Sequence, residues 1–365
     1  MPGVELHPRT EIVAAADLRE SALAAFRERY GGRTYASIEA LCADSDIDVI
    51  WVATPNEFHA RHCILAAESG KHVICTKPMA LSVAECVAMC AAASANGVEL
   101  LCGQTFSMHP SIHAMREIVT SGEIGRLIAV NTWLSTDWLL KPRLPEELDE
   151  ARGGGVVYRH GPHLIDTVRL IGGGLVRSVR GHVGRWMHDR PCAGNFSAYL
   201  EFEDGTPATV SYNGYGYFDT SELTWGHGTR MYADAERVAV RSALSAGASA
   251  EQDKSKIRFG VRELPARGLS WFGITVASCE RGDVRQSPNG VYVYGDGGRR
   301  EVVAAGDGLM GVLEMDEMVA CLFDGKPIVH DGRWGLATLE VCTALLDSST
   351  ERREIALTHQ GAVAG

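Results

Sequence analysis

Two segments of the chain carry side chains that could move a proton. Lys77 follows the apolar run 72–75 and is itself followed by a proline, while His163 and Asp166 lie three residues apart. Burial lowers the pKa of a lysine, and an imidazole titrates near neutral pH, so both groups can exchange protons under ordinary conditions. On a helix, residues three apart share a face. Together these side chains could polarise and deprotonate a substrate hydroxyl.

Each of these residues also has a structural interpretation. Most lysines are solvated surface residues, and His163 could be a hydrogen-bonded residue at the polar start of a helix. Of the pair on the helix, Asp166 fits a structural role better than His163 does. The position of Lys77 directly after a strand favours the functional interpretation, because ligands bind at strand ends in parallel sheets.

The elements that must position these groups begin with alternating strands and helices. Strands that are separated by helices of about 10–15 residues imply right-handed crossovers and a parallel sheet. Ligands bind at the carboxyl ends of the strands in such a sheet. The predicted strands are 11–16, 49–53, 72–75 and 100–102, and the predicted helices are 21–30, one opening at Ser37, 57–69 and 82–96. The residues after each strand, namely Asp17, Thr54, Pro55, Asn56, Thr76 and Lys77, are therefore candidate cofactor contacts.

Asp17 ends the first predicted strand, where a carboxylate would accept hydrogen bonds from the adenosine ribose of NAD. It could instead cap the following helix. The guanidinium of the nearby Arg19 could hold the 2′-phosphate of NADP, so NADP is a second, less favoured candidate cofactor. A dinucleotide site also needs a preceding strand and a Gly-x-Gly-x-x-Gly turn. Only ten residues precede Glu11 and they contain one glycine, so we expect a Rossmann-like sheet truncated at its first strand.

The pattern changes after about Gly125 to segments that alternate or are rich in β-branched and aromatic residues. These predicted strands are 127–133, 176–183, 196–203 and 207–212, with a hairpin at Glu203-Asp204-Gly205. Residues 243–256 are a predicted surface loop, and 310–323 and 333–348 are predicted helices. We therefore expect an incomplete NAD-binding domain over 1–125 and, over 126–365, an α+β domain for substrate binding and dimerisation with a large, mostly antiparallel sheet.

Composition narrows the class of protein. The 365 residues have a net charge of −11, 45% hydrophobic and 22% charged residues, so we expect a globular protein without a nucleic-acid or membrane partner. No apolar run is long enough to span a bilayer, and the first residues lack a signal-peptide pattern. The ten cysteines include no Cys-x-x-Cys pair. We predict no metal site, no disulfide framework and a cytoplasmic location.

Several spaced motifs together resemble the Gfo/Idh/MocA family of oxidoreductases. They are Thr54-Pro55-Asn56-Glu57-Phe58-His59, Gly70-Lys71-His72-Val73, Thr76-Lys77-Pro78, Gly122-Glu123-Ile124-Gly125 and the glycines 153–155 followed by His163 and Asp166. The third motif keeps the family's lysine and lacks its preceding glutamate. The resemblance implies an NAD-dependent enzyme with Lys77 and His163 as catalytic residues, and it adds His59 to the cofactor contacts.

Many family members carry an aspartate four residues before the histidine, where this sequence has Arg159. One branch that this chain resembles, the phthalate 4,5-cis-dihydrodiol dehydrogenases, shares this departure. The likeness lies in 141–149, 158–163, 330–335 and 337–342. It implies oxidation of a carboxylated arene cis-dihydrodiol to a catechol. Arg159, Arg143 and Asp166 are then the expected substrate-binding residues, since arginine pairs bidentately with carboxylates. Arg143 could equally be a surface residue of a proline-rich loop.

Two other functions compete with this one. A sugar or cyclitol dehydrogenase of the same family would need hydroxyl-binding carboxylates in its pocket, and Arg159 argues against it. A non-catalytic or truncated relative would lack cofactor binding altogether, which the absent glycine turn favours. For an enzyme of this kind we expect a homo-oligomer, a dimer or tetramer formed through the strand-rich second domain.

Overall fold

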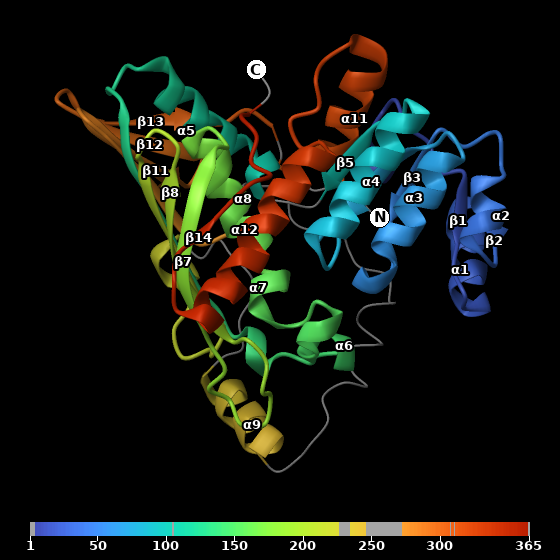
Figure 1. The fold of residues 1–365 in the computed structure, drawn as a ribbon, viewed down its shortest axis with the longest axis horizontal. Helices are drawn as coiled ribbons and strands as arrows, with labels where there is room; N and C mark the ends of the chain where they lie inside the picture. Colours follow the sequence, from blue (N-terminus) through green and yellow to red (C-terminus); the bar gives the residue numbers. More distant parts are fainter. Residues whose placement is uncertain are drawn as a thin grey trace.

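The structure is a computed structural model that describes residues 4–103, 106–225, 234–245, 272–306, 308–309 and 311–363. Its chain forms a sheet-and-helix unit at the N-terminal end and a broad sheet with helices at the other (Figure 1). Between the two lie the ends of several strands and helices that carry the predicted chemistry.

The N-terminal unit alternates strands and helices as predicted. Its elements are β1 (Ala14–Ala16), α1 (Glu20–Tyr30), β2 (Arg33–Tyr35), α2 (Ile38–Cys42), β3 (Val49–Val52), α3 (His59–Glu68), β4 (His72–Thr76), α4 (Val83–Asn96) and β5 (Leu100–Gly103). All its strand pairs are parallel, which confirms the Rossmann-like class. Ser37 and Ser82 cap α2 and α4 through their hydroxyls, as helix-opening serines do.

The parallel strands form two separate sheets in the described residues. β1 pairs with β2, and β3, β4 and β5 form a three-stranded sheet in that order. The first strand is shorter than the predicted 11–16, because only three of its residues pair with β2. Gly32 follows closely, and a Cβ there would meet the carbonyl oxygen of Val13 at 2.6 Å, so glycine permits this tight approach.

The second unit is built on a nine-stranded sheet in the order β13-β12-β11-β10-β6-β9-β8-β7-β14. Among the strands of the described residues, only the β6–β9 pair of this sheet is parallel, so the prediction of a mostly antiparallel sheet is confirmed. Gly205 takes a φ of 83° in the predicted hairpin between β8 and β9. The strands are β6 (Leu127–Ser135), β7 (Val176–Gly184), β8 (Asn195–Phe202), β9 (Pro207–Asn213), β10 (Ile274–Cys279), β11 (Gly282–Ser287), β12 (Gly290–Gly295), β13 (Gly298–Val303) and β14 (Ile355–Ala356).

Helices pack on this sheet and bury its apolar residues. α5 contacts β12, α8 contacts β6 and α12 contacts β7, as the ribbon shows (Figure 1). The prediction of a surface loop over 243–256 is partly wrong, because residues 243–245 end α9. Residues 246–256 lie outside the described residues. The helices are α5 (Pro110–Ser121), α6 (Pro145–Leu148), α7 (Gly155–Arg159), α8 (Gly161–Gly172), α9 (Asp234–Ser245), α11 (Val312–Asp324) and α12 (Gly332–Glu351), with short 3-10 turns at 4–6, 56–58, 106–108, 138–140, 150–152 and 220–223.

α12 joins the two units. It packs on β7 of the large sheet and on α4 and β5 of the N-terminal unit. Just before it, the carbonyl of His330 accepts the backbone N–H of Cys102 at 2.8 Å, and Asp331 bridges to Leu101. The boundary at residue 125 stays a prediction, but the C-terminal helices contact both sides of it.

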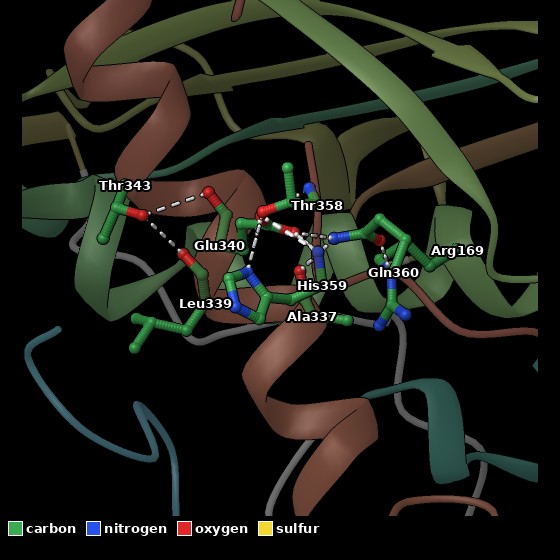
Figure 2. Close-up of polar contacts among 8 residues, drawn as sticks. All are labelled: Arg169, Ala337, Leu339, Glu340, Thr343, Thr358, His359 and Gln360. Carbon is green, nitrogen blue, oxygen red and sulfur yellow. Dashed lines mark hydrogen bonds and ion pairs between the residues drawn. The ribbon is translucent and has the colours of Figure 1, made fainter. Parts of the chain in front are cut away.

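The chain after α12 folds back onto that helix. The carboxylate of Glu340 accepts hydrogen bonds from the backbone and side chains of Thr358 and His359 and from Nε2 of Gln360 (Figure 2). Gln360 in turn accepts a bond from Nε of Arg169 on α8 at 3.0 Å. The segment 358–360 therefore fastens α12 to α8.

Three further features concern the described residues. No helix among them has the length and apolar character to cross a membrane. They contain no group of three or more potential metal ligands. All ten cysteines are free thiols.

Candidate active site

Lys77 lies where β4 ends, at the junction of the two units. Its Nζ donates a hydrogen bond to the backbone oxygen of Arg159, the last residue of α7. Burial of the ammonium, with a smaller contribution from the Arg159 guanidinium, lowers the pKa of Lys77 to about 7. A substantial fraction of this lysine is therefore neutral at pH 7, and a neutral amine can accept a proton.

His163 lies in the first turn of α8, next to Lys77 and among aromatic rings. Its ring meets Phe106 and Phe272 edge-on, with centroids 5.2 and 4.7 Å away. Burial, together with the charge of Lys77, holds its pKa well below the ordinary value, so the imidazole is neutral. In the described part of the chain its Nδ1 has no hydrogen-bond partner. A buried polar atom without a partner marks a place where a ligand or water belongs.

Asp166 lies one turn further along α8 and is completely buried. Its Oδ1 accepts hydrogen bonds from Nε1 of Trp334 and from Oγ1 of Thr338, and its Oδ2 accepts one from Oγ of Ser107. The carboxylate thus lies behind the site, and its oxygens are already hydrogen-bonded. It lines, with Lys77, a pocket of about 10 Å³ whose other walls are Pro78, Met79, Cys102, Pro162, Trp334, Gly335, Thr338 and Leu339.

Cationic side chains gather beside Lys77 in this acidic protein. Arg159 and Arg143 both act on the electrostatics of His160, next to Lys77 itself. Arg143 is 8% exposed, so its interpretation as a surface residue is wrong. Its Nε donates to the carbonyl of Trp138 at 2.9 Å, and its guanidinium lies 3.6 Å from the carboxylate of Glu147.

A wall of flat rings completes this side of the site. His160 stacks between Tyr212 and Phe272, with ring centroids 4.6 and 5.5 Å away and planes within 18° of parallel. Phe106 in turn stacks on Phe272 at 4.5 Å. Flat rings favour offset or edge contact with another ring, so a six-membered unsaturated ring fits such surroundings.

Asp17 ends β1 on the cofactor side. Its carboxylate accepts two hydrogen bonds from the guanidinium of Arg19, at 3.0 and 2.7 Å, and one from the backbone N–H of Arg19 at 2.8 Å. These contacts lower the pKa of Asp17, and the hydrogen bond from the side chain of Arg19 makes the largest contribution. The N-cap of α1 is Arg19, so the alternative role of Asp17 as that helix cap is wrong.

The other predicted cofactor residues hold the strand ends together. His59 is buried, and its two ring nitrogens lie 2.9 and 2.8 Å from the carbonyl oxygens of Pro78 and Thr54. Burial opposes its protonation, but Cys75 and these carbonyls raise its pKa above the ordinary value. Oγ1 of Thr76 donates to the carbonyl of Val52 at 3.2 Å.

Asn56, which follows Pro55, links this region to the glycine-rich segment before α7. Its Nδ2 donates to the carbonyls of Arg152 and Gly153 at 3.5 and 3.4 Å. A Cβ on Gly153 would lie 2.8 Å from that same nitrogen. The glycine therefore permits the close contact that brings α7, with Arg159, next to Lys77.

The spacing Gly-x-Gly-x-x-Gly does occur once in the sequence, at Gly306, Gly308 and Gly311. It lies between the antiparallel strand β13 and α11, and not between a parallel strand and a helix as a dinucleotide site requires. Glu314 already accepts the backbone N–H of Gly311. The assignment of Asp17 and of the ends of β3 and β4 to NAD binding stays a prediction.

Two family models match the sequence. Residues 1–104 match the model described as "Oxidoreductase family, NAD-binding Rossmann fold", and residues 112–232 match the model of the GFO/IDH/MocA C-terminal domain. One relative, "1-carboxy-3-chloro-3,4-dihydroxycyclo hexa-1,5-diene dehydrogenase" of Comamonas testosteroni, is 31% identical over 360 residues, 95% of this chain and 90% of the relative.

Solved structures resemble the fold over nearly its whole length. A structure described as a putative dehydrogenase from Bordetella bronchiseptica RB50 has a TM-score of 0.90 and 36% identity, covering 98% of this chain and 95% of the other. The WlbA dehydrogenase from Bordetella pertussis, solved with NADH and UDP-GlcNAcA, has a TM-score of 0.70 at 20% identity, with 98% and 93% covered. At that identity the second likeness shows the fold alone.

Proposed function

The chain belongs to the Gfo/Idh/MocA family of NAD-binding oxidoreductases, and we propose that it oxidises a carboxylated arene cis-dihydrodiol to a catechol. The observation that carries this proposal is the low-pKa Lys77 beside Arg159 and a wall of aromatic rings. The relative from Comamonas testosteroni, whose name describes a carboxylated dihydroxycyclohexadiene, supports the same substrate class.

The reaction balances with one cofactor and one released proton. NAD, when bound, accepts a hydride from the carbinol carbon. The hydroxyl proton of that carbon leaves at the same time, and the ring then tautomerises to the aromatic catechol. The sum is dihydrodiol and NAD⁺ giving catechol, NADH and H⁺. Recovery of aromaticity makes the oxidation strongly favourable.

Lys77 and His163 handle the hydroxyl. In its neutral form, Lys77 accepts the hydroxyl proton at Nζ, which its pKa of about 7 permits. The neutral imidazole of His163 has an unpartnered Nδ1, which can hydrogen-bond the same oxygen and guide that transfer. Water is kept away by the rings of Phe106 and Phe272.

The arginines hold the carboxylate of the substrate in different ways. Arg159 is the residue that pairs with it, since the hydrogen bond from Lys77 to its backbone oxygen places the two residues side by side. The guanidinium of Arg143 already contacts the carbonyl of Trp138 and the carboxylate of Glu147. It therefore adds positive electrostatic potential to the site without pairing directly with the substrate carboxylate. Asp166 also lies behind the substrate and takes no part in binding it directly.

Asp17 would hold the adenosine ribose of NAD. In the structure the guanidinium of Arg19 is paired with Asp17, so a 2′-phosphate would have to displace a carboxylate to reach it. Two negative groups at one site repel, which favours NAD over NADP. The ends of β3 and β4, with Thr54, Pro55, Asn56, His59 and Thr76, complete the cofactor side.

Assembly through the large sheet accompanies this function. Trp133 on β6 and Tyr199 on β8 are 41% and 43% exposed on one face of the sheet, since Tyr199 and Asn131, two residues before Trp133, both pair with Thr209. Exposed apolar residues gathered on one sheet face mark an interaction site, which supports a dimer or tetramer formed there. Ten free thiols fit a reducing compartment, the cytoplasm.

Arg159→Met tests the substrate class. The variant removes the guanidinium but keeps the backbone oxygen that accepts the Lys77 bond. We expect KM for a carboxylated cis-dihydrodiol to rise by about tenfold or more, since a charged pair contributes about 1.5–3 kcal/mol. For an uncharged cis-dihydrodiol at pH 9, where Lys77 is largely neutral with or without the Arg159 guanidinium, kcat/KM should stay near the wild-type value. NADH absorbance measures both.

Arg152→Met is the matched control, because Arg152 lies in the same segment but pairs with Glu57 at the surface. It should leave both substrates unaffected. A wild-type preference for inositol-like polyols over every cis-dihydrodiol would contradict the proposed substrate class. Failure to bind NAD at millimolar concentration would remove the enzymatic function itself.

A further inference from the structure

Four buried side chains form a continuous hydrogen-bonded chain that starts at the pocket under Lys77. Asp166 accepts the hydroxyl of Ser107, and that hydroxyl lies 2.8 Å from Nε2 of His330. Nδ1 of His330 lies 2.8 Å from Oε2 of Glu317. The first three side chains are at most 1% exposed, while the side chain of Glu317 is 17% exposed.

The four residues come from separate parts of the fold. Ser107 lies in the 3-10 turn Phe106–Met108, Asp166 in α8, Glu317 in α11, and His330 just before α12. The backbone of His330 is held in addition, since its N–H donates to Oε1 of Glu317 at 2.7 Å. This hydrogen-bonded chain therefore runs from the interior of the protein to the surface of α11.

Each middle member of the chain can both give and take a proton. A serine hydroxyl has one proton and two lone pairs, and a neutral imidazole has one nitrogen of each kind. Burial opposes the charged form of His330, but the Glu317 carboxylate raises the pKa of His330 above the ordinary value, and Glu317 has a lowered pKa in return. The contact with Glu317 therefore favours the protonated form of His330, and the neutral form, which can accept a proton at Nε2, gains as pH rises.

We propose that Asp166, Ser107, His330 and Glu317 form a relay that carries the reaction proton from Lys77 to solvent. The inference rests on the proposed function, because a dehydrogenase releases one proton for each hydride transferred. Substrate and cofactor cover Lys77 during turnover, so its proton needs a path through the protein. The pocket that Lys77 and Asp166 share has room for about one water molecule to join them.

The transfer conserves protons and needs no other reactant. A proton that reaches Asp166 passes to the oxygen of Ser107, whose own proton moves to Nε2 of neutral His330. The Nδ1 proton of His330 then moves to Glu317 and on to solvent. One proton enters and one leaves. His330 then carries its remaining proton on Nε2, and a rotation of the Ser107 hydroxyl together with a turn of the His330 ring restores the chain without returning a proton to Asp166.

Ser107→Ala breaks the relay by removing one hydroxyl. Rapid mixing with NAD⁺ and dihydrodiol, followed by NADH absorbance and by a pH indicator together, separates hydride transfer from proton release. In wild type we expect the two signals to rise together. In the variant the first NADH should form at nearly the wild-type rate, the proton should lag behind it, and kcat should fall about 10- to 100-fold.

Glu317 supplies a second test that leaves the buried part of the chain intact. Glu317→Gln keeps an oxygen for the backbone of His330 but cannot take up a proton, so it should show the same lag. Glu317→Asp keeps a carboxylate and should recover most of the rate. A merely structural role would not separate the amide from the shorter acid in this way.

Ser111→Ala is the control, since Ser111 is equally buried and contacts His109 outside the chain. It should release protons in step with NADH. If Ser107→Ala or Glu317→Gln also does so, with kcat within about twofold of wild type, the relay is wrong while the proposed function stands. A wild-type protein that forms no NADH from any dihydrodiol overturns the proposed function and, with it, the relay.

Discussion

Lys77 combines two properties that exposed lysines lack: burial and a cationic neighbour. Both disfavour its charged form, and its pKa of about 7 follows from the protein around it. The guanidinium of Arg159 contributes to this lowered pKa, and we propose that it also pairs with a substrate carboxylate. When that carboxylate binds, it would partly cancel the effect of Arg159 on the pKa of Lys77. Substrate and base are therefore electrostatically coupled.

Lys77 predicts the pH dependence of the reaction. Oxidation needs the neutral amine, so kcat/KM should rise as pH increases through about 7 and then level off, whereas an unperturbed lysine would titrate near 10.5. Lys77→Met should lose the pH step and about 10²- to 10⁴-fold in kcat. Initial rates between about pH 5.5 and 9, roughly the range in which the enzyme stays folded, measure this.

Lys77→Arg is the companion variant for this experiment. It keeps a positive charge and the hydrogen-bonding capacity, but a guanidinium does not lose its proton in this pH range. It should be as inactive as the methionine variant. An arginine variant with wild-type activity would show that the residue acts through its charge and not as a base.

Sequence patterns singled out Lys77, His163 and Asp166 as candidates, but not Ser107 or Glu317. Lysine after a strand and histidine at a helix start are local patterns. Ser107 and Glu317 have no such pattern, because they meet Asp166 and His330 only through contacts 59 and 13 residues apart in the chain. His330 lay in a motif that supported the family resemblance, but that motif gave it no role.

At the scale of the elements, α8 depends on the chain that follows α12. Arg169 of α8 donates to the carbonyl of Trp334 at 3.1 Å and to Oγ1 of Thr338 at 2.7 Å, while Gln360 accepts its Nε. Figure 2 shows this arginine at one end of the contacts that centre on Glu340. The orientation of α8, and with it His163, is thus fixed from its far side.

Glu340→Ala should destabilise the fold. The buried carboxylate accepts several hydrogen bonds from 358–360, so its loss should lower the free energy of unfolding by about 2 kcal/mol. Burial opposes ionisation, but these donors lower the pKa of Glu340 overall. Its contribution is therefore present above pH 4.5, the ordinary value, and lost as pH falls through the lowered one. Urea unfolding measures the change.

Glu351→Ala provides the control on the same helix. Glu351 is exposed and pairs only with Arg353 among the contacts that the described residues show, an interaction that contributes little. The control should leave the unfolding midpoint nearly unchanged. Equal midpoints for the two variants would show that the segment 358–360 does not stabilise the protein.

The predicted elements were most accurate where polar residues interrupt apolar runs. Ser37 and Ser82 marked helix starts to within one residue, and Gly205 marked the hairpin. The four strands between 274 and 303 were not predicted. Their signal was present in Val291-Tyr292-Val293-Tyr294 between glycines, but strand pairing with β6, more than a hundred residues earlier, is not a local property.

At the scale of the whole molecule, the net charge of −11 contrasts with the cations around Lys77. Some of the acidic residues form exposed ion pairs, such as Glu20 with Arg27 and Glu39 with Arg61. Such pairs contribute little to stability. A local positive site inside an acidic protein selects small anions without attracting nucleic acids.

The cysteines predict how the native protein reacts with thiol reagents. Eight are buried, and only Cys90 and Cys321 are partly accessible. Burial raises the pKa of Cys90 to about 11 and raises that of Cys321, so their reactive thiolate forms are scarce at pH 8. Ellman's reagent should label at most these two slowly in the native state. All ten should react after denaturation.

Reducing agent serves as the control for this experiment. Because every cysteine is a free thiol, dithiothreitol should leave the unfolding midpoint unchanged. Rapid labelling of more than two thiols in the native protein would contradict the burial of the other eight.

The dual contact of α12 limits how parts of this protein can be exchanged with those of its relatives. A chimera that recombines the chain at residue 125 would place a foreign nucleotide-binding half against α4 and β5 contacts made by the resident α12. It would also disrupt the hydrogen bond from the backbone N–H of Cys102 to the carbonyl oxygen of His330. The modular unit for such grafting is therefore discontinuous, and consists of the N-terminal unit together with α12.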